Sequence, residues 1–421
     1  MTVITDKKAF EKAVPILATD AKRLPKLLDS LSPAERHWAA ASGFDGAANA
    51  VAILPDAKGG IARVLAGVRA GDDPWAIAGL ALKLPRGRYA LGKGPVTIAP
   101  EKAAFAWDLG GYQFTRYKKA KRKPADLQLE GSSRVKEALD MAQAVRLVRD
   151  MVNTPAEDMG PEQLSDIARE QAELFGGEFD EWVGDELLAQ NFPAIHAVGR
   201  AAARAPRLLE INWGNPKHPK VAIVGKGVCF DSGGLDIKTA EGMRLMKKDM
   251  GGAAHAIALS RLIMQRELPV RLHMVVPTVE NAISGNAYRP GDVVRTRKGL
   301  TVEIGNTDAE GREHRAQPLR LAPDRAPRAA RVVPREHVEV RPRDLLGNEV
   351  VEEERGDDGS RVAAPARVVD VGDLRVEEAP VVAPQRQAPD RIVECLGLRQ
   401  QLRGELFVVR EEHRQLWAQR H

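Results

Sequence analysis

The chain has 421 residues, 43% of them hydrophobic and 29% charged, with a formal net charge of +5 at neutral pH. This composition is that of a globular protein long enough for two or three domains with apolar cores. It excludes an obligate membrane protein, because no apolar run approaches the ~18 residues that a membrane helix needs. The charge is also too small for this length to indicate nucleic-acid binding by itself.

The first residues and the cysteines bear on the cellular compartment. The opening stretch "MTVITDKKAFEKAV" has no continuous apolar segment after its charges, so we predict no secretory signal. Two cysteines, Cys229 and Cys395, cannot form a disulfide framework. We therefore expect a soluble protein in the reducing cytoplasm.

Residues 1–125 mix strand-like runs, "ANAVAILP" and "ALKLPRGRYAL", with helical ones, and we interpret them as a smaller N-terminal α/β domain. This domain ends near the basic run "RYKKAKRKP" at 116–124. Such a run can bind nucleic acid, but only Tyr117 is interleaved with its charges. We favour a solvated linker for this run.

The segment "SSRVKEALDMAQAVRLVRDMVNTPAEDMGP" has apolar residues at helical spacing and predicts a helix, with Ser133 as its N-cap and Pro155 beyond its end. Strand and helix patterns then alternate: "RLLEINWG", "KVAIVGKG", a helix from about Met243 to Arg266, "VRLHMVVPTVE" and "LTVEIGNT". This alternation predicts a mostly parallel central sheet flanked by helices. In such sheets ligands bind at the carboxyl ends of the strands, where the unusual charges of this chain occur.

Those charges begin in "VAIVGKGVCFDSGGLDIK", where Lys226 ends a buried strand and Asp231 precedes a glycine turn that leads to Lys238. A lysine at the end of a buried strand pairs with an acid or loses its proton to a metal, because burial disfavours the free ammonium group. Asp249 follows near the start of a helix, in "MKKDMGGAAH". Any one of these residues alone would most simply be an ordinary salt bridge.

Two further carboxylates occur in "NTDAEGR", where Asp308, Glu310 and Arg312 alternate and so share one side of an extended backbone. Four carboxylates brought together without metal would repel each other, at several kcal/mol per buried ion. Two divalent cations bring their charge to zero, and Lys226 can then coordinate as a neutral amine. Oxygen ligands with one amine suit Zn²⁺, Mn²⁺ or Mg²⁺.

These segments resemble the leucyl aminopeptidase (cytosol aminopeptidase) family of two-metal exopeptidases. The resemblance covers roughly residues 100–312 and includes "VNTPAEDMGP", "VGKGVCFDSGGLDIK", "MKKDMGGAAH", "NAYRPGD" and "NTDAEGR". It implies an α/β fold with the N-terminal domain at 1–125 and a catalytic domain at 126–312. The implied activity is release of N-terminal, leucine-like residues from peptides that have a free N-terminus. The family is typically a homo-hexamer.

The resemblance also implies roles for individual residues. The metal ligands would be Lys226, Asp231, Asp249, Asp308 and Glu310, with Asp231 and Glu310 serving both of two divalent ions (Zn²⁺ or Mn²⁺). The catalytic residues would be Lys238, which polarises the scissile carbonyl and steadies the oxyanion, and Arg312, which holds a bicarbonate acting as general base. Met246 and Asn306 match positions near the substrate side-chain pocket, although Met246 fits an ordinary core position equally well.

Other readings of the same residues stay open. Cys229 has no partner histidine nearby and is interpreted as a buried structural residue, and His255 as a hydrogen-bonded helix residue. A non-catalytic metal- or nucleic-acid-binding relative is the alternative function, motivated by the basic run and by the arginine-rich tail. A two-metal phosphatase is a third, against which the amine ligand Lys226 argues.

Residues 313–421 differ from the rest of the chain, because they contain no Lys, Met, Thr or Tyr and are rich in Arg, Pro, Val and Ala. None of the family's expected pattern, an apolar helix with an Ala-Asp pair and a Thr-rich turn, follows Arg312. We interpret this anomalous tail as an out-of-frame translation of a GC-rich gene, or as disordered. Because the support of Asp308, Glu310 and Arg312 would come from this part, the hypothesis leaves the activity and the hexamer of this chain open.

Overall fold

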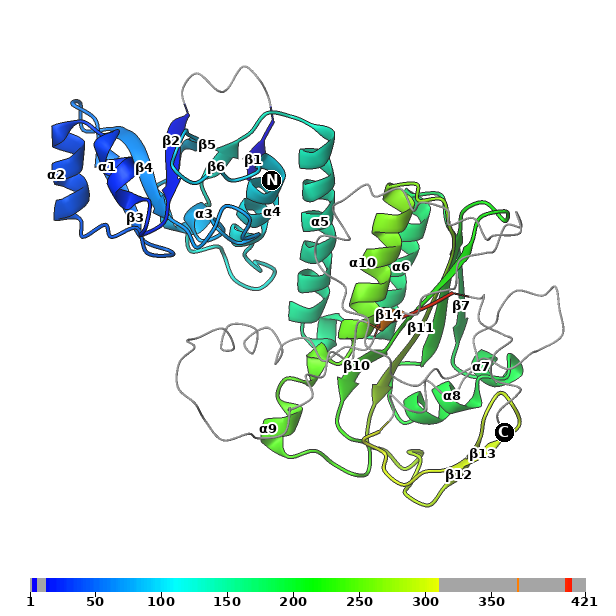
Figure 1. The fold of residues 1–421 in the computed structure, drawn as a ribbon. Helices are drawn as coiled ribbons and strands as arrows, with labels where there is room; N and C mark the ends of the chain where they lie inside the picture. Colours follow the sequence, from blue (N-terminus) through cyan, green and yellow to red (C-terminus); the bar gives the residue numbers. More distant parts are fainter. Residues whose placement is uncertain (1, 6–12, 310–368, 371–405, 411–421) are drawn as a thin grey trace, which may run out of the picture. The chain divides into compact units, whose positions relative to one another are not determined.

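A computed structural model describes residues 2–5, 13–309, 369–370 and 406–410. The chain divides into two compact units, Met1–Asp150 and Met151–His421 (Figure 1). The predicted boundary near residue 125 stays a prediction. Within the described ranges no helix is long and apolar enough to cross a membrane.

The first unit is built on a six-stranded sheet in the order β1-β6-β5-β2-β4-β3, in which only the edge pair β3–β4 is antiparallel. Its strands are β1 (Val3–Ile4), β2 (Val14–Thr19), β3 (Val51–Pro55), β4 (Ile61–Gly67), β5 (Arg88–Leu91) and β6 (Asp126–Gln128). Its helices are α1 (Leu24–Asp29), α2 (Pro33–Ala41), α3 (Leu80–Lys83), α4 (Pro100–Gly110) and α5 (Ser133–Asn153).

Alternating residues of the central strands serve two apolar cores on the two faces of this sheet. Ile16 and Val64 belong to the core that includes α3, α4 and the start of α5. The next residues along each strand, Leu17 and Leu65, belong to the core under α1 and α2. The period of two therefore produces a sheet covered on both faces, as predicted for an α/β domain.

Two local predictions in this unit need correction. The run "ALKLPRGRYAL" is not one strand: Leu80–Lys83 is helical, and Leu84 is extended (ψ 150°) because a residue before proline avoids the helical region. Helix α5 already begins at Ser133, so the predicted N-cap is one residue too late: the capping oxygen is that of Ser132, which accepts from the backbone N–H of Val135 at 3.2 Å.

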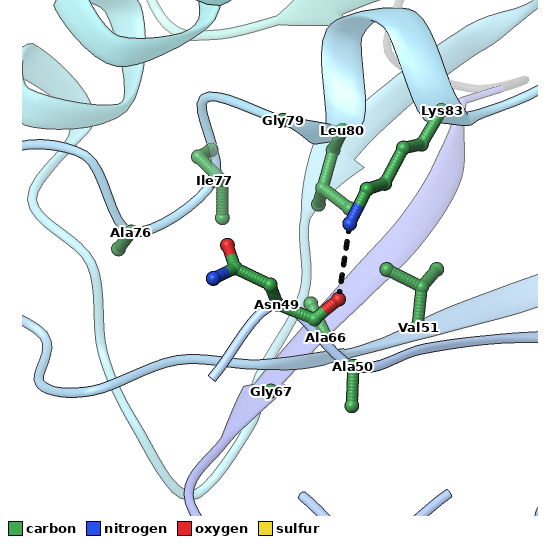
Figure 2. A pocket seen from close by; sticks show the side chains of 10 residues that line it. All are labelled: Asn49, Ala50, Val51, Ala66, Gly67, Ala76, Ile77, Gly79, Leu80 and Lys83. Carbon is green, nitrogen blue, oxygen red and sulfur yellow. Dashed lines mark hydrogen bonds between the residues drawn. The ribbon is translucent and has the colours of Figure 1, made fainter. Parts of the chain in front are cut away.

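A small cavity of the first unit lies between β3, β4 and α3 (Figure 2). Its lining is mostly apolar, and the Nζ of Lys83, one of the lining residues, donates to the carbonyl of Asn49 at 3.2 Å. With its one lysine engaged by backbone, we interpret the cavity as part of the packing.

The second unit is built around a sheet in the order β14-β15-β9-β11-β8-β7, with β10 also paired to β11. Its strands are β7 (Glu178–Val183), β8 (Arg207–Trp213), β9 (Lys220–Gly225), β10 (Gly227–Asp231), β11 (Arg271–Asn281), β14 (Val369–Asp370) and β15 (Leu406–Arg410), with a separate pair β12 (Val293–Arg295) and β13 (Thr301–Glu303). Its helices are α6 (Pro161–Leu174), α7 (Glu186–Ala189), α8 (Pro193–Gly199), α9 (Ala240–Met243) and α10 (Gly251–Gln265), with short 3₁₀ turns η2 (Ala156–Asp158) and η3 (Met246–Lys248).

Helices α6 and α10 cover one face of this sheet, and α7 and α8 cover the other (Figure 1). The predicted α/β class is therefore confirmed. The parallel pairs expected at the site are present as β9–β11 and β10–β11, while β7 and β8 add antiparallel pairs. The link between β8 and β9, residues 214–219, is too short for a crossover, so these strands run in opposite directions with β11 between them.

Helix α10 begins at Gly251 and not at Met243 as predicted. The preceding residues form α9 and η3, which leaves Asp249 in the turn before α10. A Cβ atom at Gly225 would lie 2.5 Å from the carbonyl oxygen of Gly252, so these glycines allow β9 and α10 to approach closely. This approach brings Asp249 beside the end of β9.

Candidate metal and active site

Strands β9 and β10 lie one after the other along β11, and Lys226 occupies the break between them. β9 pairs with Arg271–Val275 of β11, and β10 pairs with Thr278–Asn281. The Lys226 carbonyl accepts from the backbone N–H of Ala253 at 2.8 Å, which ties the break to the first turn of α10. The predicted lysine is thus held at a strand end, next to the helix that follows Asp249.

Lys226 pairs with Asp249, as one of the two outcomes predicted for a lysine in this position. Its Nζ lies 2.8 Å from Oδ2 of Asp249, and both side chains are largely buried, 16% and 10% exposed. This contact has the distance of an ion pair but not the direction of a hydrogen bond. Among the described residues no hydrogen bond reaches Oδ2 of Asp249. This buried carboxylate oxygen thus faces the Lys226 ammonium group and accepts no hydrogen bond from the described residues.

Lys238 lies between Asp231 and Asp308, the other two predicted metal ligands with a carboxylate in the described part of the chain. Its Nζ is 3.0 Å from Oδ2 of Asp231 and also hydrogen-bonds to Oδ1 of Asp308. Burial works to lower the pKa of Lys238, but the hydrogen bonds with the two aspartates outweigh it and the net shift is upward. Burial raises the pKa of Asp308, against the opposing effect of the Lys238 hydrogen bond.

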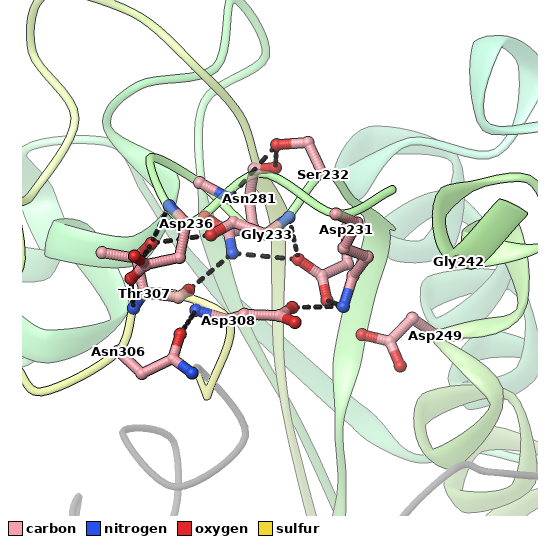
Figure 3. Close-up of polar contacts among 12 residues, drawn as sticks. Asp231, Ser232, Gly233, Asp236, Gly242, Asp249, Asn281, Asn306, Thr307 and Asp308 are labelled. Atoms are coloured by element: carbon pink, nitrogen blue, oxygen red, sulfur yellow. Dashed lines mark hydrogen bonds and ion pairs between the residues drawn. The ribbon is translucent and has the colours of Figure 1, made fainter. Parts of the chain in front are cut away.

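The carboxylates of Asp231, Asp249 and Asp308 face one common region, although they come from three separate segments (Figure 3). In the part of the chain that the structure describes, no group of three His, Cys, Asp or Glu side chains is arranged to hold a metal ion by itself. Lysine ammonium groups lie against these carboxylates, as cations that partly balance their charge. Predicted residues Glu310 and Arg312 lie outside the described residues.

The donor set fits the cations that the sequence predicted. Each of the three aspartates contributes an oxygen to the common region, and Lys226 adds a nitrogen at its edge. Carboxylate oxygens with one amine are ligands that divalent Zn²⁺, Mn²⁺ or Mg²⁺ accept. Two buried carboxylates, Asp231 and Asp249, and the partly exposed Asp308 also carry more negative charge than two lysines balance.

The two residues predicted near a substrate pocket have different surroundings. Met246 is half-buried in η3, three residues before Asp249. Asn306 is exposed, and its Oδ1 accepts from the backbone N–H of Asp308 at 2.7 Å. Asn306 therefore shapes the turn that presents Asp308, and its role toward substrate stays a prediction.

The two residues that the sequence excluded from catalysis are buried or hydrogen-bonded, as expected. Cys229 is fully buried in β10, and burial raises the pKa of its thiol well above its ordinary value. The Nδ1 of His255 lies 2.7 Å from the carbonyl of Gly251, one helical turn away.

Sequence reasoning missed three polar residues that hold the site together: Asp236, Asn281 and Thr307. Asn281 ends β11 and is 1% exposed, while Thr307 is completely buried beside Asp308. The signal for Asn281 was its place directly after a long apolar strand. The signal for Thr307 was its place between two predicted site residues in "NTDAEGR".

Comparison with known proteins covers both units. Residues 14–130 match the M17 aminopeptidase N-terminal domain, and residues 146–332 match the catalytic domain of the cytosol aminopeptidase family. The match therefore begins earlier and ends later than the roughly 100–312 that the motifs indicated. Both matched domains are those of peptidases.

Two relatives and three solved structures illustrate the similarity. The probable cytosol aminopeptidase of Leifsonia xyli is 37% identical over 307 residues, which are 69% of this chain and 62% of that protein. That of Brucella anthropi is 36% identical over 314 residues, 68% of this chain and 63% of that protein. This chain thus spans less than two thirds of the length of these relatives.

Among solved structures, the cytosol aminopeptidase of Coxiella burnetii is 45% identical with a TM-score of 0.70, covering 74% of this chain and 68% of that one. The bottromycin maturation enzyme BotP in complex with Mn is 30% identical with a TM-score of 0.63, covering 74% and 70%. The leucyl aminopeptidase of Trypanosoma brucei in complex with bestatin is 25% identical with a TM-score of 0.62, covering 75% and 68%. The chain belongs to the cytosol aminopeptidase family.

Proposed function

We propose that the protein is a metal-dependent aminopeptidase that releases N-terminal, leucine-like residues from peptides. The observation that carries the proposal is the convergence of Asp231, Asp249 and Asp308 on one region that Lys226 and Lys238 border. Three carboxylates and two lysines brought together from distant segments are costly unless they bind something. The names of the relatives, cytosol and leucyl aminopeptidases, support this substrate class.

Two divalent cations are the cofactors we propose, held by Lys226, Asp231, Asp249 and Asp308 together with Glu310. BotP, one of the solved structures that this chain resembles, is in complex with Mn, which supports a divalent ion here. Bound cations of this kind supply a nucleophile from water at neutral pH. Lys226 would have to lose its proton to bind, so loading of the site should improve as the pH rises.

Lys238 is the residue we assign to the reacting carbonyl group. Its ammonium group is held in the common region by Asp231 and Asp308, so its position does not depend on a flexible surface side chain. A fixed positive charge stabilises the oxyanion that develops in the transition state more than it stabilises the substrate. Arg312 is the second catalytic residue that the family resemblance implies, and it would hold a bicarbonate that acts as general base.

The test is hydrolysis of leucine amide by the purified 421-residue protein, with and without Mn²⁺. We expect turnover that depends on the metal and falls about 10²- to 10³-fold in Lys238→Ala, the range found when one oxyanion-stabilising group is removed. Metal-independent turnover, or equal turnover in the variant, would contradict the proposal.

Metal binding without turnover would favour the alternative, a non-catalytic relative. Two further proposals have tests of their own: fractionation of cells that express the protein for a cytoplasmic location, and sedimentation of the purified protein for a homo-hexamer.

A further inference from the structure

Two loops that carry predicted metal ligands, residues 231–238 and 305–309, are joined by a compact set of hydrogen bonds, which are buried at Asn281 and partly buried at Asp236. Three side chains make this connection: Asp236, Asn281 and Thr307, which we call the Thr307 latch. The two loops are far apart in the sequence, yet Asp231 and Asp308 must lie close together to share a cation. Something has to set their separation, and no backbone pairing between the two loops does so among the described residues.

Thr307 and Asp236 bond reciprocally across the two loops. The backbone N–H of Asp236 donates to Oγ1 of Thr307 at 2.9 Å, and the backbone N–H of Thr307 donates to Oδ2 of Asp236 at 2.7 Å. The single hydroxyl proton of Thr307 then goes to the carbonyl of Gly233 at 2.7 Å, which is closer than Oδ2 of Asp236 at 3.1 Å. Thr307 therefore contacts both ends of the glycine turn that follows Asp231.

Asn281 links the same two loops from the end of β11. Its Nδ2 donates to Oδ1 of Asp231 and to the carbonyl of Thr307, each at 2.9 Å. Oδ1 of Asp231 also accepts from the backbone N–H of Gly233 at 2.9 Å. With two donors on Oδ1, Asp231 is oriented so that Oδ2 is the oxygen turned to Lys238 and to the common region.

Close packing around these groups leaves little freedom for the loops. Tyr288 donates its hydroxyl proton to the carbonyl of Thr307 at 2.8 Å, and its side chain is 2% exposed. A Cβ atom at Gly234, where φ is +64°, would lie 2.9 Å from Oδ1 of Asn281 and 3.0 Å from Oγ1 of Thr307. The turn fits against the latch because this residue has no side chain.

We propose that Asn281, Asp236 and Thr307 are positioning residues that set the distance and orientation of Asp231 relative to Asp308. The proposal rests on the proposed function, because it assigns the latch to the metal site of that function. A group that orients a metal ligand is typically buried and hydrogen-bonds the ligand's outer oxygen, the one turned away from the metal. Asn281 has both properties, because it is buried and donates to Oδ1 of Asp231. Of the predicted catalytic residues, Lys238 lies within the described part of the chain, and there the three latch side chains make no hydrogen bond to its ammonium group.

A matched set of threonine variants tests the proposal in the 421-residue protein. Thr307→Val keeps the shape of the side chain but removes Oγ1, while Thr307→Ser keeps Oγ1. Thr296→Val is the control, since Thr296 is also buried, 4% exposed, and its hydroxyl donates to the carbonyl of Leu300 at 3.1 Å, within the turn between β12 and β13. The probe is Co²⁺, whose visible absorption reports the number and arrangement of its ligands.

We expect Thr307→Val to weaken Co²⁺ binding by about 10-fold, the lower end of the effect of losing a direct hydrogen-bond partner of a metal ligand, because Thr307 acts on Asp231 through the turn at Gly233 and not by a bond to a ligand oxygen. Its absorption spectrum should also change, and Thr307→Ser should restore both the affinity and the spectrum. Thr296→Val should match the unchanged protein. Equal affinity and spectrum in Thr307→Val would overturn the proposal, because a merely structural hydroxyl would lower thermal stability without altering the bound Co²⁺.

Hydrogen exchange of the metal-free protein separates failure of the latch from failure of the proposed function. The latch predicts that the amides of Asp236 and Thr307 are protected, and that Thr307→Val exposes the amide of Asp236 to exchange. If the unchanged protein binds no Co²⁺ but shows this pattern, the metal-site function falls while the latch between the loops stands. If exchange at Asp236 is the same in Thr307→Val, the latch is wrong whatever the protein binds.

Discussion

The ammonium group of Lys226 lies 2.8 Å from Oδ2 of Asp249, and this pair joins the break between β9 and β10 to the turn before α10. Both partners are largely buried, so each needs the other when no metal is bound. Loss of one partner from a buried ion pair is destabilising, because the desolvated charge that remains loses its nearest counter-charge.

For the metal-free protein we therefore expect Lys226→Met to lower the free energy of unfolding by about 3–5 kcal/mol. Asp249→Asn tests the other partner, and the double variant should recover a large part of the loss, because no buried charge is then left alone. Urea unfolding of the four proteins measures the coupling. Effects of the two single variants that simply add would show that the pair contributes nothing to stability.

Close approach of β9 to α10 depends on Gly225. A Cβ atom there would lie 2.5 Å from the carbonyl oxygen of Gly252 and 2.8 Å from Cα of Ala253, and both are backbone atoms that cannot turn aside. We expect Gly225→Ala to lower the free energy of unfolding by about 1–3 kcal/mol or more. Gly285→Ala is the matched control, because a Cβ there meets nothing within 4 Å, and it should change stability by less than about 0.5 kcal/mol. Similar effects of the two substitutions would contradict this account of the packing.

His273 makes the stability of the second unit depend on pH. Burial, with Arg271 and Lys220 nearby, lowers the pKa of His273 from 6.5 to about 4, and its Nδ1 lies 2.7 Å from Oδ1 of Asn212. The unfolded chain takes up this proton at a higher pH than the folded chain does. The stabilisation is therefore complete above pH 6.5, declines as the pH falls toward 4, and is absent below that.

Between pH 7 and pH 5 this residue should lower the free energy of unfolding by about 2 kcal/mol. His273→Gln, which does not titrate, should remove that part of the pH dependence in urea unfolding measured at both pH values. An unchanged slope in the variant would show that His273 is protonated at the same pH in the folded and unfolded chain.

Residues 313–421 raise a prediction about the gene. We propose that their lack of Lys, Met, Thr and Tyr reflects a change of reading frame near Arg312. The catalytic-domain match runs on to residue 332, so we expect the change between the codons for residues 312 and 332. Resequencing the DNA across these codons tests it, and the alternative frame should encode an apolar continuation with leucines and an Ala-Asp pair. Absence of such a continuation in either other frame would refute the hypothesis.

Much of the site could be recognised in the sequence because its charged residues follow apolar strands. A charge at the end of a buried strand is costly unless it is paired or binds a ligand, so such positions indicate a site. Lys226 and Asp231 flank a buried strand, and the negative charge of the clustered carboxylates predicted that cations bind beside them. Sequence also identified β8, β9, β11 and α5, whose patterns of apolar residues are long and regular. The same periodicity misplaced the start of α10, since it registers apolar residues and not the contact of Gly225 with Gly252.

The sequence by itself determined which residues are charged, that the long apolar runs of β8, β9 and β11 are strands, and to which family the chain is similar, because these properties depend on local order and composition. Only the tertiary structure decided that Lys238 stands between Asp231 and Asp308, and that Lys226 pairs with Asp249. It alone revealed Asn281 and Thr307 as the connection between the two loops. Lys238 and Asp308 are 70 residues apart, and their contact arises from the insertion of β11 beside β9 and β10, which no local pattern encodes.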